Sequence, residues 1–283
     1  MDKHFNTPSE VIEGNIQAGV GKATLPLGKM ILLGIMAGAF IALGGATSST
    51  AVHSISDVGL ARTLAGAIFP VGLMMIVFVG GELFTGNCLI TMAVLDKKAT
   101  IGQLVRNLVV VYFSNLVGAL IVDFLIFYSG NLDYTNGLLG AYTIKVAVAK
   151  ASITPVKAVT SGILCNMLVC LAILMAGAAK DVAGKIWAIF FPIWAFVVGG
   201  FEHCVANMFY IPAGILAASN PDYVAKAEEA YGITAAQCEN LTVLQSLHNF
   251  IPVTIGNIIG GAVCIGVAYF FIFRKDWNKK AAS

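Results

Sequence analysis

The sequence predicts an all-α integral membrane protein in which six transmembrane helices form an inverted repeat of three plus three. The first observation is composition, because 58% of the 283 residues are hydrophobic and only 11% are charged, whereas about a quarter of residues are charged in soluble domains. The second is that the apolar residues gather in six runs of bilayer length. The third is that two of these runs exceed one crossing and share an internal motif.

Each of the six apolar runs is longer than the roughly 18 residues that a membrane-crossing helix requires. The runs are Met30–Val52, Thr63–Leu95, Leu104–Tyr128, Ala158–Ala179, Ile186–Ala218 and Phe250–Phe273. They occupy most of the chain, so we expect a single transmembrane domain over residues 1–283. Residues 1–29 would form an N-terminal segment, and residues 274–283 a C-terminal tail.

The basic residues predict the orientation in the membrane, since short loops rich in Lys and Arg usually face the cytoplasm. Most of them fall on the side of the chain termini. The opposite side holds Arg62, Lys145, Lys150, Lys157 and Lys226. We therefore expect both termini in the cytoplasm, with the protein in the inner (cytoplasmic) membrane of a cell and in contact with membrane lipid.

Three segments lie outside the apolar runs. Thr7-Pro8-Ser9-Glu10 is typical of a helix start with a capping box, and an apolar stripe then continues until Pro26. This pattern predicts an amphipathic helix at the inner membrane interface. Residues 141–151 predict a short outer helix, and the mixed segment 220–248 predicts a solvated cap.

The second and fifth runs are each interrupted by the same polar motif. The run Thr63–Leu95 would exceed 45 Å as one ideal helix, against a hydrocarbon core of roughly 30 Å. Residues 80–87 and 200–207 both read Gly-x-Glu-x-x-x-x-Asn. The following run of each half adds a second match, Asn115-x-x-Gly118 and Asn257-x-x-Gly260. We therefore predict that helices two and five are broken at these motifs.

These matches divide the chain into two repeats of three spans. An odd number of crossings makes the second copy enter the membrane from the opposite side, which gives inverted topology. Interrupted helices at equivalent positions of such repeats point to a substrate site near the midplane. The freed backbone N–H groups at each break would favour an anion.

Glu82, Glu202 and His203 are the ionisable residues nearest the centre of the spans, where a charge costs at least about 2.5 kcal/mol. The two glutamates are related by the repeat, and we interpret them as structural supports that accept hydrogen bonds from the amides freed by the break. His203 has Leu83 as its counterpart, so symmetry does not account for it. Its unperturbed pKa of about 6.5 suits a group that donates to, or exchanges a proton with, a passing weak acid.

Several function classes are disfavoured. The net charge of +2 is too small to create the field on which nucleic-acid binding depends. No phosphate-binding Gly-x-x-x-x-Gly-Lys-Ser/Thr motif, zinc-protease motif or Cys-x-x-Cys pair occurs, so we expect no enzyme activity, cofactor or metal. The alternative from another class is a membrane-embedded enzyme or metal-binding protein that uses Glu82, Glu202, His203 and Cys204.

Three long motifs resemble the formate/nitrite transporter family. They are residues 80–86 (Gly-Gly-Glu-Leu-Phe-Thr-Gly), 162–172 (Gly-Ile-Leu-Cys-Asn-Met-Leu-Val-Cys-Leu-Ala) and 200–208 (Gly-Phe-Glu-His-Cys-Val-Ala-Asn-Met). The resemblance covers nearly the whole chain. It implies an aquaporin-like channel fold, assembled as a homopentamer with one anion pathway in each protomer.

The resemblance also implies roles for individual residues. His203 matches the central histidine, beside Thr85 and Asn166, while Glu202 and Asn207 match residues that support it. Phe84, Val169 and Phe196 match the outer constriction, Leu73 matches the inner one, and Phe69 lies nearby. Lys150 matches a basic residue of the outer vestibule and Lys22 one on the inner side, where each would attract anions.

The family motifs do not separate formate from nitrite, hydrosulfide, acetate or lactate. We expect a passive or proton-coupled pathway for small monovalent anions, with formate as the first candidate. Nitrite and hydrosulfide are the alternatives within the family. One departure is Gly86-Asn87 after Thr85, where some formate channels carry other small polar residues.

Overall fold

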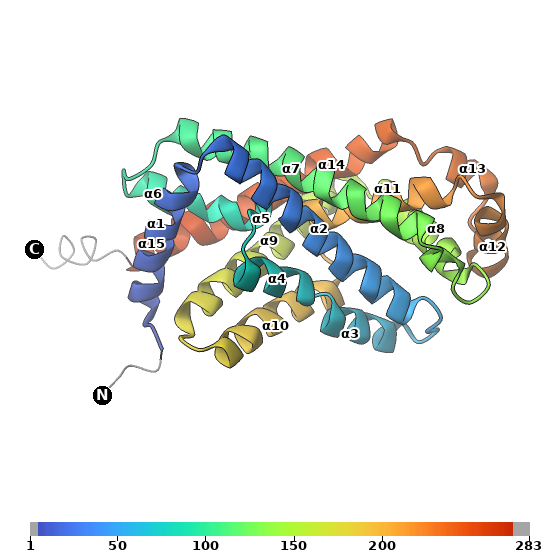
Figure 1. The fold of residues 1–283 in the computed structure, drawn as a ribbon, viewed down its shortest axis with the longest axis horizontal. Coiled ribbons are helices and arrows are strands. Elements are labelled where there is room, and N and C mark those ends of the chain that lie inside the picture. The colour runs from blue at the N-terminus through green and yellow to red at the C-terminus, as the bar shows by residue number, and fades with distance from the viewer. Residues whose placement is uncertain (1–4, 274–283) are drawn as a thin grey trace, which may run out of the picture.

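Helices make up nearly all of the computed structural model, which describes residues 5–273 (Figure 1). The expected C-terminal tail, residues 274–283, lies outside the described residues. Six described helices are long and apolar enough to cross a membrane, and they confirm the predicted spans. They are Leu27–Val52, Val58–Val79, Ile101–Tyr128, Pro155–Ala178, Val182–Gly199 and Val243–Phe273.

The first half of the chain runs from α1 to α7. Its helices are α1 (Pro8–Ala23), α2 (Leu27–Val52), α3 (Val58–Ile68), α4 (Val71–Val79), α5 (Phe84–Asn87), the 3-10 turn η1 (Cys88–Ile90), α6 (Thr91–Leu95) and α7 (Ile101–Tyr128). The second predicted span therefore consists of several pieces, with α4 and α5 separated by an extended stretch at residues 80–83.

The second half repeats this order from the opposite end of the molecule (Figure 1). After the 3-10 turn η2 (Asn131–Asp133) come α8 (Leu138–Ala151), α9 (Pro155–Ala178), α10 (Val182–Gly199), α11 (Cys204–Ala217), α12 (Pro221–Tyr231), α13 (Ala235–Glu239), α14 (Val243–Ile258), the π-helix η3 (Ile259–Val267) and α15 (Ala268–Phe273). The short helices α1 and α8 begin the two halves, so each repeat holds one helix more than the three spans.

Both long spans break at the predicted motif. Gly80 has φ +103° and Gly200 has φ +68°, a region that L side chains rarely adopt. Each glycine ends its helix, the chain then runs extended through the glutamate, and a new helix starts at Phe84 or Cys204. A glycine is thus required at each break because the chain must leave the helix abruptly inside the membrane.

Two segments differ from the sequence prediction: helix α1 in what it contacts, and the last span in where it begins. The capping box at Thr7 and Glu10 is present in α1, but the apolar stripe is buried against the spans rather than turned to the membrane interface. Val11 and Ile12 join a buried cluster with Leu174 and Phe270. The last span begins at Val243, seven residues before the predicted Phe250, because the end of the expected cap is already helical.

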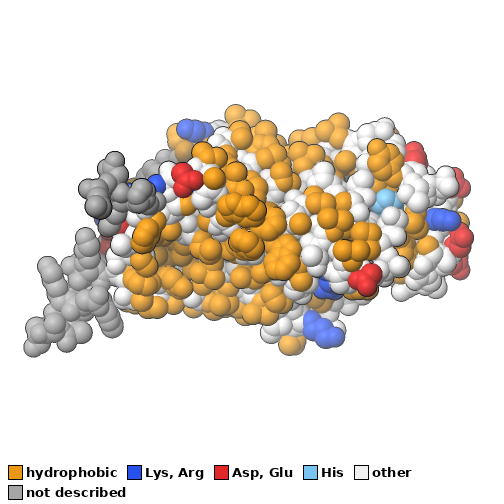
Figure 2. All heavy atoms as spheres, turned by 90° about the horizontal axis from the view of Figure 1, so that it is seen from below, with side chains coloured by type: hydrophobic (Ala, Val, Ile, Leu, Met, Phe, Trp, Pro, Cys, Tyr) orange, Lys and Arg blue, Asp and Glu red, His pale blue; other side chains and the backbone are white. Residues whose placement is uncertain are grey.

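Side chains toward the surrounding membrane are apolar. Hydrophobic residues cover much of the face seen in Figure 2, and on α7 Phe113, Val117, Ile121 and Phe124 are all exposed. A water-soluble protein rarely leaves so large a contiguous apolar surface uncovered. This surface is consistent with a multi-pass membrane protein.

Close helix pairs hold each half together. A Cβ added at Gly38 of α2 would lie 2.0 Å from the Asn115 carbonyl oxygen of α7. In the second half, a Cβ at Gly260 would lie 2.2 Å from the Ile163 carbonyl oxygen of α9. The backbones therefore approach at glycines, as small-residue motifs in membrane helices allow.

This contact predicts that Gly38→Ala destabilises the protein. The added methyl group has no space, so the two helices must separate, at a cost of about 1–3 kcal/mol. Thermal unfolding in detergent should show a clearly lower midpoint. Gly28→Ala in the same helix is the matched control, because nothing lies within 4 Å of its added Cβ. Equal midpoints for the two variants would contradict the packing account.

Candidate functional site

The two helix breaks place glutamates in the interior of the protein, and each glutamate is tied by the same set of contacts. At the first break, Lys22 Nζ lies 2.7 Å from Glu82 Oε1. Asn87 Nδ2 donates to Glu82 Oε2 at 2.6 Å and to Asn107 Oδ1 at 2.8 Å. Asn107 Nδ2 in turn donates to the Lys22 carbonyl at 3.0 Å. The buried carboxylate is thus both ion-paired and hydrogen-bonded.

The second break repeats this network with different residues. Lys150 Nζ lies 2.9 Å from Glu202 Oε1, and Asn207 Nδ2 donates to Glu202 Oε2 at 2.6 Å. Asn207 also donates to Asn249 Oδ1 at 2.7 Å, and Asn249 Nδ2 donates to the Lys150 carbonyl at 3.0 Å. The inverted repeat therefore extends to individual side-chain atoms.

Two further asparagines satisfy the backbone of the breaks. Asn115 Oδ1 accepts from the Phe84 N–H at 3.0 Å, and Asn257 Oδ1 accepts from the Cys204 N–H at 2.9 Å. The Nδ2 group of each asparagine donates to the carbonyl of the break glutamate, Glu82 or Glu202, at 2.9 Å. The expectation that the carboxylates accept from the freed amides was wrong, because asparagines occupy that position and the carboxylates bind lysines instead.

Lys22 and Lys150 were expected to attract anions from the two sides of the membrane. The structure places each ammonium against a buried glutamate, within ion-pair distance. Each lysine therefore neutralises a carboxylate, so the interior of the protein gains no net charge from either pair.

His203 is where the two networks differ. It lies at the start of α11 as its N-cap, and Nδ1 accepts from the Ala206 N–H at 3.0 Å. Because the amide can only donate, Nδ1 carries no proton, and the proton of the neutral ring sits on Nε2. Nε2 lies 2.9 Å from Thr85 Oγ1, so it donates to that hydroxyl. The imidazole is thus held as a neutral donor that faces α5.

Asn166 is the third predicted residue at this site. Its Nδ2 group donates to the Thr85 carbonyl at 3.1 Å and to the Asn257 carbonyl at 2.6 Å. Thr85, Asn166 and His203 are all at most 2% exposed. The structure therefore gathers the three residues from α5, α9 and the second break into one buried polar group.

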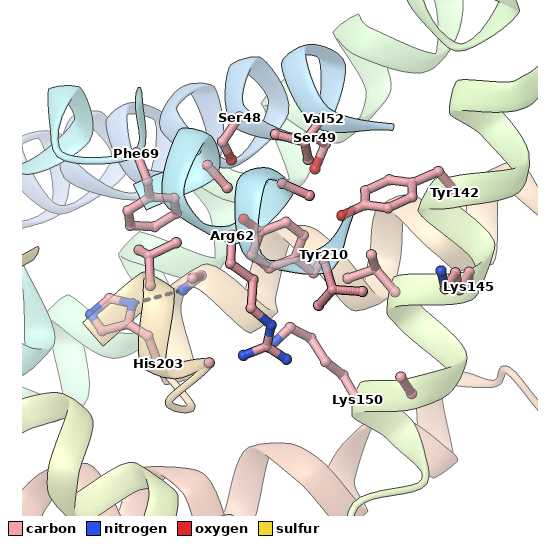
Figure 3. Close-up of a pocket in the computed structure, with 18 of the residues that line it drawn as sticks. Ser48, Ser49, Val52, Arg62, Phe69, Tyr142, Lys145, Lys150, His203 and Tyr210 are labelled. Atoms are coloured by element: carbon pink, nitrogen blue, oxygen red, sulfur yellow. Dashed lines mark hydrogen bonds between the residues drawn. The ribbon is translucent and has the colours of Figure 1, made fainter. Parts of the chain in front are cut away.

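A cavity of about 630 Å³ leads down to His203 from the end of the molecule where α3 and α8 lie (Figure 3). Phe69 and Phe196 also line it, with ring centroids 5.5 Å apart and planes at 89°. The Phe196 ring is 5.9 Å from the His203 ring. Two aromatic rings and the imidazole thus lie together on the wall of this cavity.

Two of the five predicted constriction residues, Phe69 and Phe196, line this cavity and contact each other edge to face. Phe84 packs against the Tyr112 ring of α7 at 5.0 Å, and all five residues belong to one buried hydrophobic cluster. Leu73, Phe84 and Val169 do not line the cavity among the described residues. The assignment of these five residues to an outer and an inner constriction stays a prediction.

Sequence reasoning missed Asn107 and Asn249, although a signal was present. Asn107 precedes Asn115 by the same interval as Asn249 precedes Asn257. Extending the repeat comparison toward the beginning of each span would have found both asparagines. The same comparison pairs Lys22 with Lys150, since each lies just before the first span of its half.

A family model described as "Formate/nitrite transporter" matches residues 9–271. The chain belongs to the formate/nitrite transporter family. It is 38% identical to a probable formate transporter of Methanothermobacter thermautotrophicus, over 98% of this chain and 100% of the relative. It is also 38% identical to the formate channel FocA of Escherichia coli K12, over 92% of both chains.

Solved structures agree with the fold of this transporter. A pentameric formate channel with formate bound matches with a TM-score of 0.77 and 34% identity, over 87% of this chain and 97% of the other. An FNT family ion channel matches with a TM-score of 0.79 and 28% identity, over 93% and 98%. Family members are channels or transporters, which excludes the enzyme alternative. Within residues 5–273, no group of three or more His, Cys, Asp or Glu could hold a metal ion.

The ion pair of the second break predicts a non-additive effect on stability. Lys150→Met leaves Glu202 buried and uncompensated, at a cost of about 3–5 kcal/mol. The double variant Lys150→Met/Glu202→Gln should regain much of that loss, since it buries no charge. Denaturant unfolding in detergent measures both. Lys157→Met, at an exposed lysine of the same side, is the control, and additive losses in the double variant would refute the pairing.

Proposed function

We propose that the transporter conducts small monovalent anions, formate first, across the cytoplasmic membrane. The observation that carries this proposal is the neutral donor group of His203 and Thr85 at the end of an open cavity. We further propose that residues 1–283 act as one channel domain with both termini in the cytoplasm, and that protomers assemble as homopentamers.

The neutral donors His203 and Thr85 favour a monovalent ion. The glutamates and lysines of the two breaks compensate each other, so neither ion pair adds a net charge beside the donors. Such a site binds an anion weakly enough to release it, and the cost of removing water from an ion grows steeply with its charge. Phe69 and Phe196 offer no polar replacement for that water.

His203 would act on the anion through Nε2. Its N–H can turn from the Thr85 oxygen to a carboxylate, while the Thr85 hydroxyl can donate its own hydrogen to the same ion. Negative charge beside an imidazole favours the protonated ring. In acid, the ring would take up a proton at Nδ1, release the Ala206 amide and hold the anion more strongly, which gives proton-dependent flux.

The named relatives support formate over the other anions. The Escherichia coli relative is a formate channel, and the solved pentamer has formate bound. Nitrite, acetate and lactate are also monovalent oxyanions, and hydrosulfide is monovalent without oxygen. The donor chemistry of His203 and Thr85 is compatible with all of them, so nitrite and hydrosulfide stay the rival substrates.

This role predicts that His203→Phe abolishes or strongly reduces pH-dependent formate flux into proteoliposomes. Phenylalanine has a similar shape but supplies neither a donor at Nε2 nor an acceptor at Nδ1. His248→Phe is the matched control, because His248 is exposed on α14 outside the cavity. Size-exclusion profiles of both variants would check assembly. Unchanged flux with unchanged pH dependence in His203→Phe would remove the histidine from the mechanism.

Substrate choice is tested by competition among formate, nitrite and hydrosulfide at two external pH values. We expect formate to be carried with the highest apparent affinity and to inhibit uptake of the other two, with greater uptake at the lower pH. Preference for nitrite or hydrosulfide at both pH values would replace formate as the substrate and leave the channel function standing.

A further inference from the structure

The cavity that leads down to His203 holds two cations that its own carboxylate does not neutralise. Of the charged residues that line it, Lys150 is paired with Glu202. Arg62 and Lys145 also line it. Within the described part of the chain, neither of them has an acidic oxygen within the 4.0 Å ion-pair distance. Their charges therefore remain available in the cavity.

Arg62 is held in place by the second helix break. Its Nη1 atom donates to the Val198 carbonyl at 3.2 Å, at the C-terminal end of α10, where a helix dipole favours a cation. A Cβ added at Gly200 would lie 2.6 Å from Nη1, so the glycine of the break makes room for the guanidinium. One N–H of the guanidinium makes this hydrogen bond, and its other N–H groups take no part in it.

Figure 3 shows Arg62 pointing from α3 into the open space toward which Lys150 points from α8. Burial raises the pKa of the Tyr142 hydroxyl on α8, and the positive charge of Arg62 opposes that rise. The guanidinium thus lies close enough to α8 for its charge to act there. Arg62 and Lys150 therefore approach the same space from α3 and α8.

Lys145 supplies the second cation from α8. Its Nζ atom lies 4.3 Å from the ring centroid of Tyr231 and 5.9 Å from that of Tyr142. Contact with ring faces orients an ammonium without neutralising it. Both rings also line the cavity, so the ammonium is positioned at the cavity wall with its N–H groups available to an anion.

We propose that Arg62 and Lys145 form an outer anion-binding site that selects planar monovalent oxyanions, carboxylates above all, before they reach His203. The proposal rests on the function proposed above. A guanidinium offers two parallel N–H donors that match the two oxygens of a carboxylate. Hydrosulfide has no such pair of acceptors. Lys145 adds a charge that raises the local anion concentration.

The test measures formate uptake from the outer side, in right-side-out membrane vesicles, as a function of formate concentration. Arg62→Gln and Lys145→Gln should each lower uptake at low formate about 3- to 10-fold and leave uptake at saturating formate near wild type. Arg62→Lys keeps the charge, so hydrosulfide uptake should stay unchanged while formate uptake at low concentration falls. Lys157→Gln, at an exposed outer lysine that does not line the cavity, should behave as wild type.

Salt dependence gives a second readout. Rising ionic strength should reduce wild-type uptake at low formate, because salt screens exposed charges, and Arg62→Gln/Lys145→Gln should flatten that dependence. Arg62 also caps α10. If Arg62→Gln lowers the unfolding temperature, the outer site is therefore judged from Lys145→Gln alone. If vesicles with the wild-type protein take up no formate, the proposed function is refuted. Wild-type formate uptake, with unchanged uptake and salt dependence in Lys145→Gln and in the double variant, would overturn the outer site alone.

Discussion

The structure depends on the need to compensate two carboxylates buried inside a membrane. Glu82 and Glu202 lie where helices break, and an unpaired charge at that depth is costly. Each receives a lysine and an asparagine, and the lysine comes from a short helix that precedes the spans of its half. This requirement explains why α1 and α8 are packed against the bundle instead of lying free at the membrane surface. It also explains why the repeat holds at the level of single side-chain atoms.

The two networks of paired charges are alike, and the repeats differ chemically at the position that Leu83 and His203 share. Leu83 and His203 occupy equivalent positions in the repeat, so one half has an apolar side chain where the other has an imidazole. The Ala206 amide fixes the tautomer of that imidazole, and Thr85 Oγ1 accepts the hydrogen bond from Nε2. The donor is therefore neutral and the ion pairs beside it are compensated, which suits an ion that must leave as readily as it arrives. Selection by charge takes place at Arg62 and Lys145, elsewhere on the wall of the same cavity.

Much of this arrangement follows from residue patterns. The six spans, the two breaks and the inverted repeat were predicted from run length and from the Gly-x-Glu-x-x-x-x-Asn motif, because each is a local property of the chain. The partners of the glutamates were not predicted, since Lys22 and Glu82 are far apart in sequence and meet only through packing of α1. The pairing of Phe196 with Phe69 was missed for the same reason. Val243 lies outside the predicted last span because that helix begins in a polar stretch, which hydropathy assigns to a loop.

The central claim is that His203 is a neutral donor, protonated at Nε2 and not at Nδ1, within a framework of compensated charges. Solid-state ¹⁵N NMR of histidine-labelled protein in lipid bilayers tests it most directly, with His203→Phe used to assign the signals. At neutral pH without anion, we predict one acceptor-type signal for Nδ1 and one donor-type signal for Nε2. Two donor-type signals from His203 under those conditions would show an imidazolium and contradict the account.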